Sequence, residues 1–304
     1  MKKILITGGC GFLGSHLTEF LLANKFAVRI FDTHSFPYVL NDEQRDNFEE
    51  VIGDLTNFSD VQKAVEGCEG ILHLAAISRV KDGYLRPYEC ISTNILGTAN
   101  ILESIRLSLY KPWIIISSTL EVFSDPVKAL NIETMYGITK FSLELCSHIY
   151  SKDYGLKVLI VRLSSIYGSE RDNPNKVLPI FLNKALKGET LFVNDLKPIH
   201  DYIHYKDIVS GMQKAIHYID KSINGTYEVM AFCSGTTLSL KDIAQIVIEE
   251  TNSKSEMIVR DKSSEIEKLT VLENDPSKSK ELIGFESKIV LGKGIKELLL
   301  DKKL

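Results

Sequence analysis

Two residues with complementary acid–base chemistry, Tyr136 and Lys140, lie four positions apart in the run Tyr136-Gly-Ile-Thr-Lys140. Residues four apart share one face of a helix, so the spacing predicts an ammonium group beside a phenol. A nearby ammonium lowers the pKa of a phenol toward the working pH, and such a tyrosine can take a proton from a substrate hydroxyl. The alternative is a surface tyrosine and a solvated lysine.

A hydroxyl-bearing run, Ser117-Ser-Thr119, ends an apolar segment that precedes this pair. We expect that segment to be a strand, which places Thr119 at the carboxyl edge of the sheet. There its hydroxyl can hydrogen-bond the substrate oxygen whose proton Tyr136 takes. Thr119, Tyr136 and Lys140 therefore form the candidate catalytic set.

The same spacing recurs in Tyr202-Ile-His-Tyr-Lys206. That run is strand-like, and residues four apart along a strand are far from each other. We therefore do not expect the second pair to be catalytic.

Three glycines at the start of the chain, Gly8, Gly11 and Gly14, lie between an apolar strand pattern and an amphipathic helix pattern. Gly8 permits a tight turn, Gly11 lets the backbone approach a pyrophosphate, and Gly14 brings the helix close to its strand. The free N–H groups at the helix start, around Phe12 and Leu13, then face the anion.

Asp32 ends the next strand-like run, eighteen residues after Gly14. A carboxylate there accepts hydrogen bonds from a ribose 2′-OH and repels a 2′-phosphate, which favours NAD over NADP as the cofactor. The alternative is a purely structural glycine turn.

Composition excludes several classes of protein. The chain has 304 residues and a formal net charge of −4, which gives no reason to expect nucleic-acid or membrane binding. The five cysteines stand far apart and the histidines form no HxxxH pair, so we expect no metal site and no disulfides. Without an 18-residue apolar run or a signal peptide, the sequence indicates a cytoplasmic location.

Strand and helix patterns alternate through the first half of the chain, which predicts an α/β fold of the Rossmann type, a doubly wound parallel sheet covered by helices. The expected strands are 3–7, 27–32, 48–53, 70–75, 112–117 and 157–162. The expected helices are 11–24, 57–66, 87–108 and 134–153.

After Arg162 the pattern becomes irregular and predicts a smaller mixed α/β lobe that binds substrate. We expect a cofactor-binding domain over 1–163, to which a segment at about 199–220 returns. The substrate lobe is expected over 164–198 and 221–304, with helices and short strands mixed. The lysine- and glutamate-rich segment 251–280 is expected to be a solvated face or a mobile loop.

The chain resembles the extended short-chain dehydrogenase/reductases, specifically the NAD-dependent nucleotide-sugar epimerase/dehydratase family, over nearly its whole length. The resemblance is carried by motifs in a fixed order: Thr7-Gly-Gly-Cys-Gly-Phe-Leu-Gly14, Gly53-Asp-Leu55, His73-Leu-Ala-Ala76, Asn94-Ile-Leu-Gly-Thr98, Ser117-Ser-Thr119, Tyr136-x-x-x-Lys140, Arg162, Asp201-Tyr-Ile-His204 and Asp207.

The resemblance implies further cofactor contacts. It implies that Asp54, followed by Leu55, binds the adenine, that Leu74, Ala75 and Ala76 line the cofactor, and that Asn94 supports the site. Lys140 would also hydrogen-bond the nicotinamide ribose, beside Ser117 and Tyr136. For Asp54 and Asn94 the alternative is a helix cap or a turn residue.

Several residues depart from the family pattern. His200 replaces an Arg that contacts the substrate diphosphate, and Ser165 replaces an Asn that often touches it. The segment between Thr119 and Tyr136 is shorter than usual. The diphosphate would then be bound by other cations, and the candidates are Arg171, Lys176 and Lys197.

Glu121, in Thr119-Leu-Glu-Val-Phe123, resembles the Thr-x-Glu-Val-Tyr run of sugar dehydratases and glucuronate decarboxylases. A carboxylate there could remove a C5 proton and start an elimination. However, Leu120 stands where full dehydratases carry an acid, and His200 replaces the Arg on which decarboxylases depend. An exposed loop glutamate is the other interpretation.

The sequence therefore favours an NAD-dependent nucleotide-sugar epimerase that oxidises C4 of the hexose to a ketone and then returns the hydride. The alternatives are a 4,6-dehydratase or decarboxylase that uses Glu121, an NAD(P)-dependent keto-sugar reductase, and a non-catalytic NAD-binding regulator. The substrate would be a nucleotide-diphosphate sugar.

We also expect a homodimer formed by the helical segments 87–108 and 134–153. The apolar residues that suggest it are Ile91, Ile95, Ile101, Leu102, Phe141, Leu145 and Ile149. Packing of these residues against the sheet is the alternative.

Overall fold

A seven-stranded sheet is built from six strands within residues 3–163 and from one later strand, β10. The computed structural model describes residues 2–123, 132–193, 200–260 and 274–301. The strand order is β10-β6-β5-β4-β1-β2-β3, and the pairs from β5 to β3 are parallel. The strands are β1 (Lys3–Thr7), β2 (Ala27–Asp32), β3 (Phe48–Ile52), β4 (Gly70–His73), β5 (Trp113–Thr119), β6 (Val158–Leu163) and β10 (Tyr227–Phe232).

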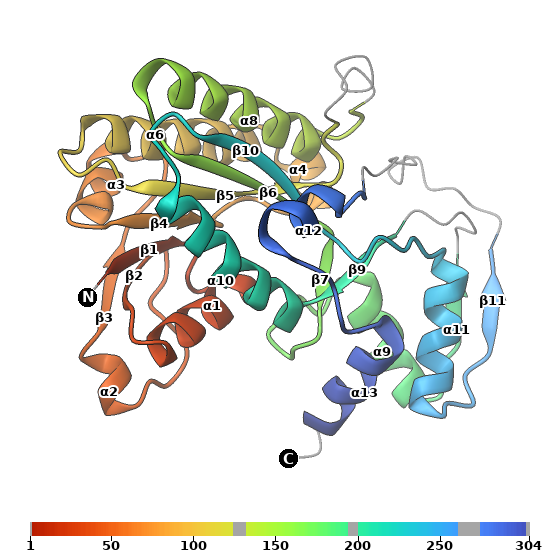
Figure 1. Cartoon of the computed structure of the whole chain (residues 1–304). Helices are drawn as coiled ribbons and strands as arrows, with labels where there is room; N and C mark the ends of the chain where they lie inside the picture. Colours follow the sequence, from red (N-terminus) through yellow and green to blue (C-terminus); the bar gives the residue numbers. More distant parts are fainter. Residues whose placement is uncertain (1, 124–131, 194–199, 261–273, 302–304) are drawn as a thin grey trace. The chain divides into compact units, whose positions relative to one another are not determined.

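Helices cover both faces of this sheet (Figure 1). They are α1 (Phe12–Ala23), α2 (Asp42–Arg45), α3 (Phe58–Val65), α4 (Val80–Leu85), α5 (Pro87–Ile91), the π-helical turn η1 (Ser92–Leu96), α6 (Gly97–Leu107) and α8 (Met135–Tyr154). Helices α3, α6 and α8 lie on one face, and α1 lies on the other. The predicted Rossmann-type α/β fold is confirmed.

Apolar strand residues explain why the sheet is buried on both faces. Ile71, Ile114 and Ile160 of three neighbouring strands are fully buried and pack against Ile101 of α6 and Leu143 of α8. Because the strands are parallel, their carboxyl ends meet at one edge, where Thr7, His73 and Thr119 end β1, β4 and β5. This edge positions the candidate site.

The remaining elements are short strands and helices. They are β7 (Ser165–Tyr167), β8 (Leu191–Val193), β9 (Tyr202–His204), β11 (Met257–Val259), α9 (Val177–Leu186), α10 (Tyr205–Lys221), α11 (Leu240–Thr251), α12 (Ser277–Ile283) and α13 (Leu291–Asp301). Two parallel pairs, β7–β9 and β8–β11, form small sheets, and α9, α11 and α13 pack around a separate apolar core that includes Phe181 and Ile243.

The chain divides into two compact units. The first comprises Met1–Arg162 and Met212–Met230, and the second comprises Leu163–Gly211 and Ala231–Leu304. The segment that returns to the first unit is Met212–Met230, which overlaps the expected 199–220 only over 212–220; residues 199–211 belong to the second unit, and 221–230, expected in the substrate lobe, belong to the first.

Three local features differ from the sequence-based expectations. The helix expected over 87–108 is interrupted by the π-helical turn Ser92–Leu96, and α4 precedes it. The segment 251–280 was expected to be a solvated face or a mobile loop. Within it, Met257–Val259 form strand β11, which pairs in parallel with Leu191–Val193 of β8. Residues 261–273 of the same segment lie outside the described residues.

Candidate active site

The glycine-rich turn between β1 and α1 is closely packed at two of its three predicted glycines. Gly8 has a φ of +72°, and a Cβ on it would lie 2.9 Å from the Ala75 backbone. A Cβ on Gly14 would lie 2.1 Å from the Gly8 carbonyl oxygen. These contacts require glycine at both positions, and they keep the start of α1 directly beside the edge of the sheet.

The start of α1 suits an anion. Gly11 is the N-cap residue, and the first turn, which includes Phe12 and Leu13, has no acidic side chain. The exposed end of a helix dipole and its N–H groups favour negative charge at such a place.

Asp32 lies at the end of β2, beside the glycine-rich turn. Its carboxylate accepts hydrogen bonds from the backbone N–H groups of Cys10 (3.0 Å) and Thr33 (2.8 Å). A carboxylate has lone pairs for more than two donors, so Asp32 can still accept a hydrogen bond from a ribose hydroxyl. Its side chain is 15% exposed.

The other predicted cofactor residues surround the same edge. Asp54 is exposed, and its carboxylate accepts the Thr56 N–H (2.8 Å), which is the turn role given as its alternative. Leu55 is buried, whereas Leu74, Ala75 and Ala76 are partly exposed after β4.

Asn94 is 1% exposed and lies in the π-helical turn. Its amide accepts the Ile77 N–H (2.9 Å) and donates to Ile77 O (3.1 Å) and to Thr139 Oγ1 (2.9 Å). Asn94 therefore ties the segment after β4 to helix α8, and through Thr139 it is linked to the Tyr136 carbonyl (2.8 Å). This geometry fits a residue that supports the site.

The predicted catalytic residues come together at the end of β5. The Thr119 side chain lies close enough to the Tyr136 hydroxyl to favour its deprotonated form, which opposes the rise in the Tyr136 pKa. Lys140 Nζ lies 5.8 Å from the centre of the Tyr136 ring and donates to the Ser117 carbonyl oxygen at 2.7 Å. Lys140 is only 3% exposed, so it is not the solvated lysine of the alternative interpretation.

Burial shifts the acidity of both groups. It lowers the pKa of Lys140 to about 8, and the Glu144 carboxylate opposes that change. It raises the pKa of Tyr136 above the usual range, and the charge of Glu121 adds to the rise. The expectation that Lys140 lowers the pKa of the phenol is therefore not met in this form of the protein, because desolvation outweighs other effects on Tyr136.

Glu121 is partly buried beside these residues and is not an exposed loop residue. Its carboxylate accepts a hydrogen bond from Thr134 Oγ1 at 2.6 Å. Burial raises the pKa of Glu121, and the bond from Thr134 opposes the rise. The segment 124–131, between Glu121 and Thr134, lies outside the described residues.

The second Tyr-x-x-x-Lys run has a different geometry. Tyr202 belongs to strand β9, whereas Lys206 belongs to helix α10 and its Nζ pairs with Glu297 at 2.9 Å. Lys206 therefore forms an ion pair with Glu297 and does not share a helix with Tyr202.

Sequence reasoning missed several side chains that hold the site together. His73 Nδ1 lies 2.8 Å from Thr7 Oγ1, and His73 Nε2 lies 2.9 Å from Thr98 Oγ1. Since Thr98 donates to Asn94 O (2.6 Å), it accepts from His73, which fixes a neutral ring protonated at Nε2. No local spacing signals such a bond, because its partners come from β1, β4 and α6.

The residues that differ from the family pattern lie in the second unit. Ser165 is exposed in β7, and His200 forms an antiparallel bridge with Leu238. Of the candidate cations for the diphosphate, Lys176 pairs with Asp172 at 2.7 Å, Arg171 is partly buried, and Lys197 lies outside the described residues.

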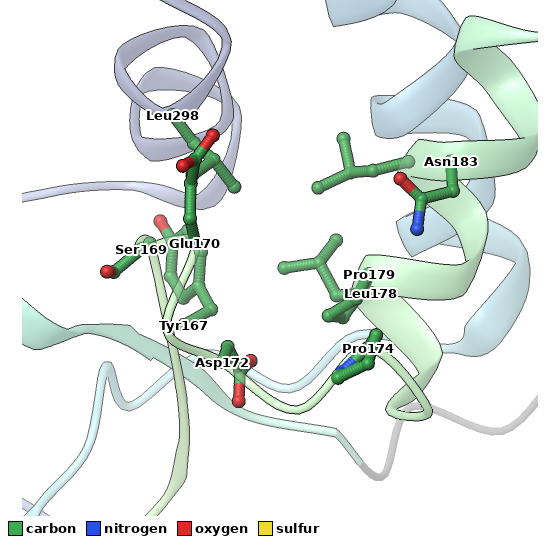
Figure 2. A pocket seen from close by; sticks show the side chains of 11 residues that line it. Tyr167, Ser169, Glu170, Asp172, Pro174, Leu178, Pro179, Asn183 and Leu298 are labelled. Atoms are coloured by element: carbon green, nitrogen blue, oxygen red, sulfur yellow. The ribbon is translucent and has the colours of Figure 1, made fainter. Parts of the chain in front are cut away.

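A cavity of about 150 Å³ lies within the second unit, between the loop that follows β7 and helices α9 and α13 (Figure 2). Its walls combine apolar side chains, including Tyr167, Leu178 and Leu298, with polar ones such as Glu170 and Asn183. None of the predicted catalytic residues lines this cavity.

The described residues also bear on metal binding and on membrane insertion. Within them, no group of three or more His, Cys, Asp or Glu side chains could hold a metal ion. Nor does any helix in this part of the chain combine the length and the apolar character needed to span a membrane.

Comparison with known proteins decides the family. The family model "NAD dependent epimerase/dehydratase family" matches residues 4–229, which is most of the chain. The chain belongs to this family. The resemblance inferred from the motifs is thereby confirmed.

Relatives within the family differ in activity. A UDP-N-acetyl-alpha-D-glucosaminuronate decarboxylase of Bacillus cytotoxicus is 29% identical and covers 98% of this chain and 97% of its own length. A UDP-glucuronic acid decarboxylase of Danio rerio is 27% identical over 98% of this chain and 72% of its own.

Among solved structures, the UDP-glucose 4-epimerase of Thermotoga maritima with UDP-glucose has a TM-score of 0.84 and 26% identity. The match covers 99% of this chain and 98% of that one. Epimerase and decarboxylase relatives are thus similar to this chain at comparable identity.

Proposed function

We propose that this protein is an NAD-dependent nucleotide-sugar 4-epimerase. The observation that carries the proposal is the meeting of Thr119, Tyr136 and an almost fully buried Lys140 at the end of β5, where Lys140 Nζ lies 5.8 Å from the centre of the Tyr136 ring. Epimerisation at C4 requires these three side chains and a bound redox cofactor, whereas the competing reactions require further acid–base groups. The similar Thermotoga maritima epimerase supports a UDP-hexose as the substrate class.

The glycine-rich turn fits NAD. Gly8 and Gly14 leave no room for a Cβ, Gly11 caps α1, and Asp32 is placed at the end of β2 to accept a ribose hydroxyl. The residues after β4 would line the cofactor, and Lys140 would bond its nicotinamide ribose. When bound, NAD supplies reversible hydride acceptance.

The catalytic side chains divide the work on the substrate oxygen. Tyr136 takes the proton of the C4 hydroxyl and later returns it, and Thr119 hydrogen-bonds the same oxygen. Burial holds the Tyr136 proton. The phenolate therefore needs a neighbouring positive charge, which Lys140 would supply once substrate and cofactor are bound. Lys140 is held at the site by the Ser117 carbonyl.

Glu121 supports a second candidate function, a 4,6-dehydratase or decarboxylase. Its buried carboxylate acts electrostatically on Tyr136, and its raised pKa would suit a base that removes a C5 proton. Against this, Leu120 is 1% exposed and cannot protonate a leaving hydroxyl. The carboxylate of Glu121 is also engaged by Thr134.

We also propose a homodimer. Ile138, Leu145 and Ile149 of α8 are 45%, 53% and 47% exposed, at spacings that place them on one face of the helix. Ile101 and Leu102, expected at the same contact, are fully buried in the core and belong to the packing against the sheet. Light scattering should give twice the chain mass, and Leu145→Glu with Ile149→Glu should give the monomer mass.

The experiment that tests the proposed function is incubation with NAD and a panel of nucleotide sugars, with products identified by NMR. A C4 epimer of one nucleotide hexose is the expected product, without net consumption of NADH. A 4-keto-6-deoxy sugar or released CO₂ would instead establish the chemistry based on Glu121. Stoichiometric oxidation of NADH would establish a keto-sugar reductase.

A further inference from the structure

A buried ion pair lies next to the candidate active site. The Arg162 guanidinium donates two hydrogen bonds to the Glu144 carboxylate, from Nε at 3.1 Å and from Nη2 at 2.8 Å. The two side chains are only 6% and 5% exposed. Burying such a pair carries a large desolvation cost, and apolar side chains of similar size are often as stable or more stable. The pair therefore calls for a role beyond stability.

Strand β5 connects this pair to the catalytic residues. Ser118 Oγ donates to Glu144 Oε1 at 2.5 Å, whereas the neighbouring Ser117 carbonyl accepts from Lys140 Nζ. Thr119, the next residue, lies beside Tyr136 and opposes the rise in its pKa. Three consecutive residues of one strand thus contact, in chain order, the lysine, the ion pair and the tyrosine.

Helix α8 holds Glu144 from the other side. Glu144 lies four residues after Lys140, so the two side chains share one face of the helix. Tyr227 of β10 also donates its hydroxyl proton to the Glu144 carbonyl oxygen at 3.1 Å. Tyr227 thus fixes the backbone at Glu144, and the bonds from Ser118 and Arg162 hold the carboxylate itself.

The charges around Lys140 single out Glu144. Burial opposes the ammonium form of Lys140, and the two groups that favour it are Glu144 and Cys90 of α5. The Cys90 thiol is neutral near pH 7 because burial raises its pKa. His73 of β4 is neutral as well, since its pKa is lowered to about 3, and Tyr136 retains its proton. Glu144 is therefore the remaining negative charge that acts on Lys140.

We propose that the Glu144–Arg162 pair is a positioning element of the site, which keeps Lys140 in its ammonium form at the end of β5. Arg162 fixes the Glu144 carboxylate, and that carboxylate stabilises the ammonium. The role in catalysis rests on the proposed function, because it is the ammonium that promotes proton removal from Tyr136. The electrostatic effect itself does not depend on the reaction.

The test is the titration of Lys140, followed by NMR in protein labelled with ¹³C at lysine Cε. Lys140→Met identifies the resonance. In Glu144→Gln the midpoint should fall by at least about one pH unit, since an opposite charge at close range shifts a pKa by about 1–3. An unchanged midpoint would overturn the proposal. Because no substrate is needed, this result is independent of whether the protein proves to be an epimerase.

Two matched variants separate charge from packing. Ser118→Ala removes a hydrogen bond from Glu144 but no charge, so the Lys140 midpoint should stay at its wild-type value. Glu103→Gln removes a carboxylate from a more exposed pair with Arg106 and should also leave it unchanged. A shift in Ser118→Ala as large as that in Glu144→Gln would mean that packing is responsible, and would contradict the proposal.

A double variant covers the case in which Glu144→Gln fails to fold, because that substitution removes the carboxylate bound by the buried Arg162 guanidinium. Glu144→Gln/Arg162→Met contains no uncompensated buried charge. The double variant removes the guanidinium's repulsion of the Lys140 ammonium together with the carboxylate's attraction, so the midpoint should fall by less than in Glu144→Gln. A wild-type midpoint in the folded double variant would refute the role of Glu144.

Discussion

The Thr134 hydroxyl donates a hydrogen bond of 2.6 Å to the Glu121 carboxylate and accepts one of 2.9 Å from the Gly137 N–H. Thr134 is the N-cap residue of α8, so the same side chain caps the helix that carries Tyr136 and fixes Glu121 beside it. The helix dipole favours a negative charge at this end, which offsets part of the desolvation cost of Glu121.

Thr134→Ala should lower both stability and turnover. Loss of an N-cap costs about 1 kcal/mol in the free energy of unfolding, measurable by urea denaturation. Ser239→Ala is the matched control, because Ser239 caps α11 through the Asp242 N–H. It should cost similar stability and leave turnover unchanged. Equal turnover in the two variants would mean that Thr134 acts only as a helix cap and has no effect on catalysis.

Asp32→Ala should weaken NAD binding and reduce discrimination against NADP. A hydrogen bond to a charged acceptor is worth about 1.5–3 kcal/mol, so the Kd for NAD should rise roughly tenfold or more. Calorimetric titration with each cofactor measures both effects, and Asp46→Ala, an exposed carboxylate after α2, is the control. Preference of the wild-type protein for NADP would disprove the role of Asp32.

Tyr136→Phe should lower kcat by at least about 100-fold while the Kd for NAD stays unchanged, because the substitution removes only the proton-transfer group. Tyr202→Phe is the control for the other copy of the motif, since Tyr202 is similarly buried. Steady-state kinetics should show a far smaller loss there. Equal losses would mean that the catalytic tyrosine has been misassigned.

His73 should make the protein sensitive to acid. Burial lowers the pKa of His73 to about 3 from its ordinary value of 6.5, and the charge of Lys140 adds to the drop. Between these values the unfolded chain binds the extra proton. The stabilisation is therefore complete above pH 6.5 and is lost as pH falls toward 3, by up to about 1.4 kcal/mol per pH unit. In His73→Gln, urea denaturation at several pH values should give a shallower slope, and an unchanged slope would exclude His73 as the source.

The regular elements of the fold could be predicted because their signals are local. The apolar run before the first glycine gives β1, and the glycine spacing gives the start of α1. The elements that were missed depend on tertiary contacts. Helix α4 contains a glycine and packs against α8, and β11 is a three-residue strand stabilised by pairing with β8.

The candidate site was predictable to a similar extent. The spacing of Tyr136 and Lys140, and the hydroxyl run that ends in Thr119, indicated which side chains would meet. The sequence could not indicate that Thr134 would engage Glu121, or that Glu144 would pair with Arg162, because these contacts join separate elements. The raised pKa of Tyr136 was also missed, since the depth of burial depends on packing.

Glu121→Gln distinguishes the two chemistries proposed for the site. The substitution keeps the size and hydrogen-bonding capacity of the side chain but removes the base. Epimerisation at C4 moves no C5 proton, so its rate should fall only modestly. An elimination that begins with removal of the C5 proton should nearly stop, and a near-complete loss of turnover would therefore contradict the epimerase assignment.

The origin of the hydrogen atoms in the product tests the central claim most directly. UDP-glucose, or whichever nucleotide hexose the panel identifies, is converted in D₂O, and the product is examined by NMR. Return of the substrate's own hydride predicts a C4 epimer that carries protium at both C4 and C5. Deuterium at C5, or a 4-keto-6-deoxy product, would contradict the account and assign the reaction to Glu121.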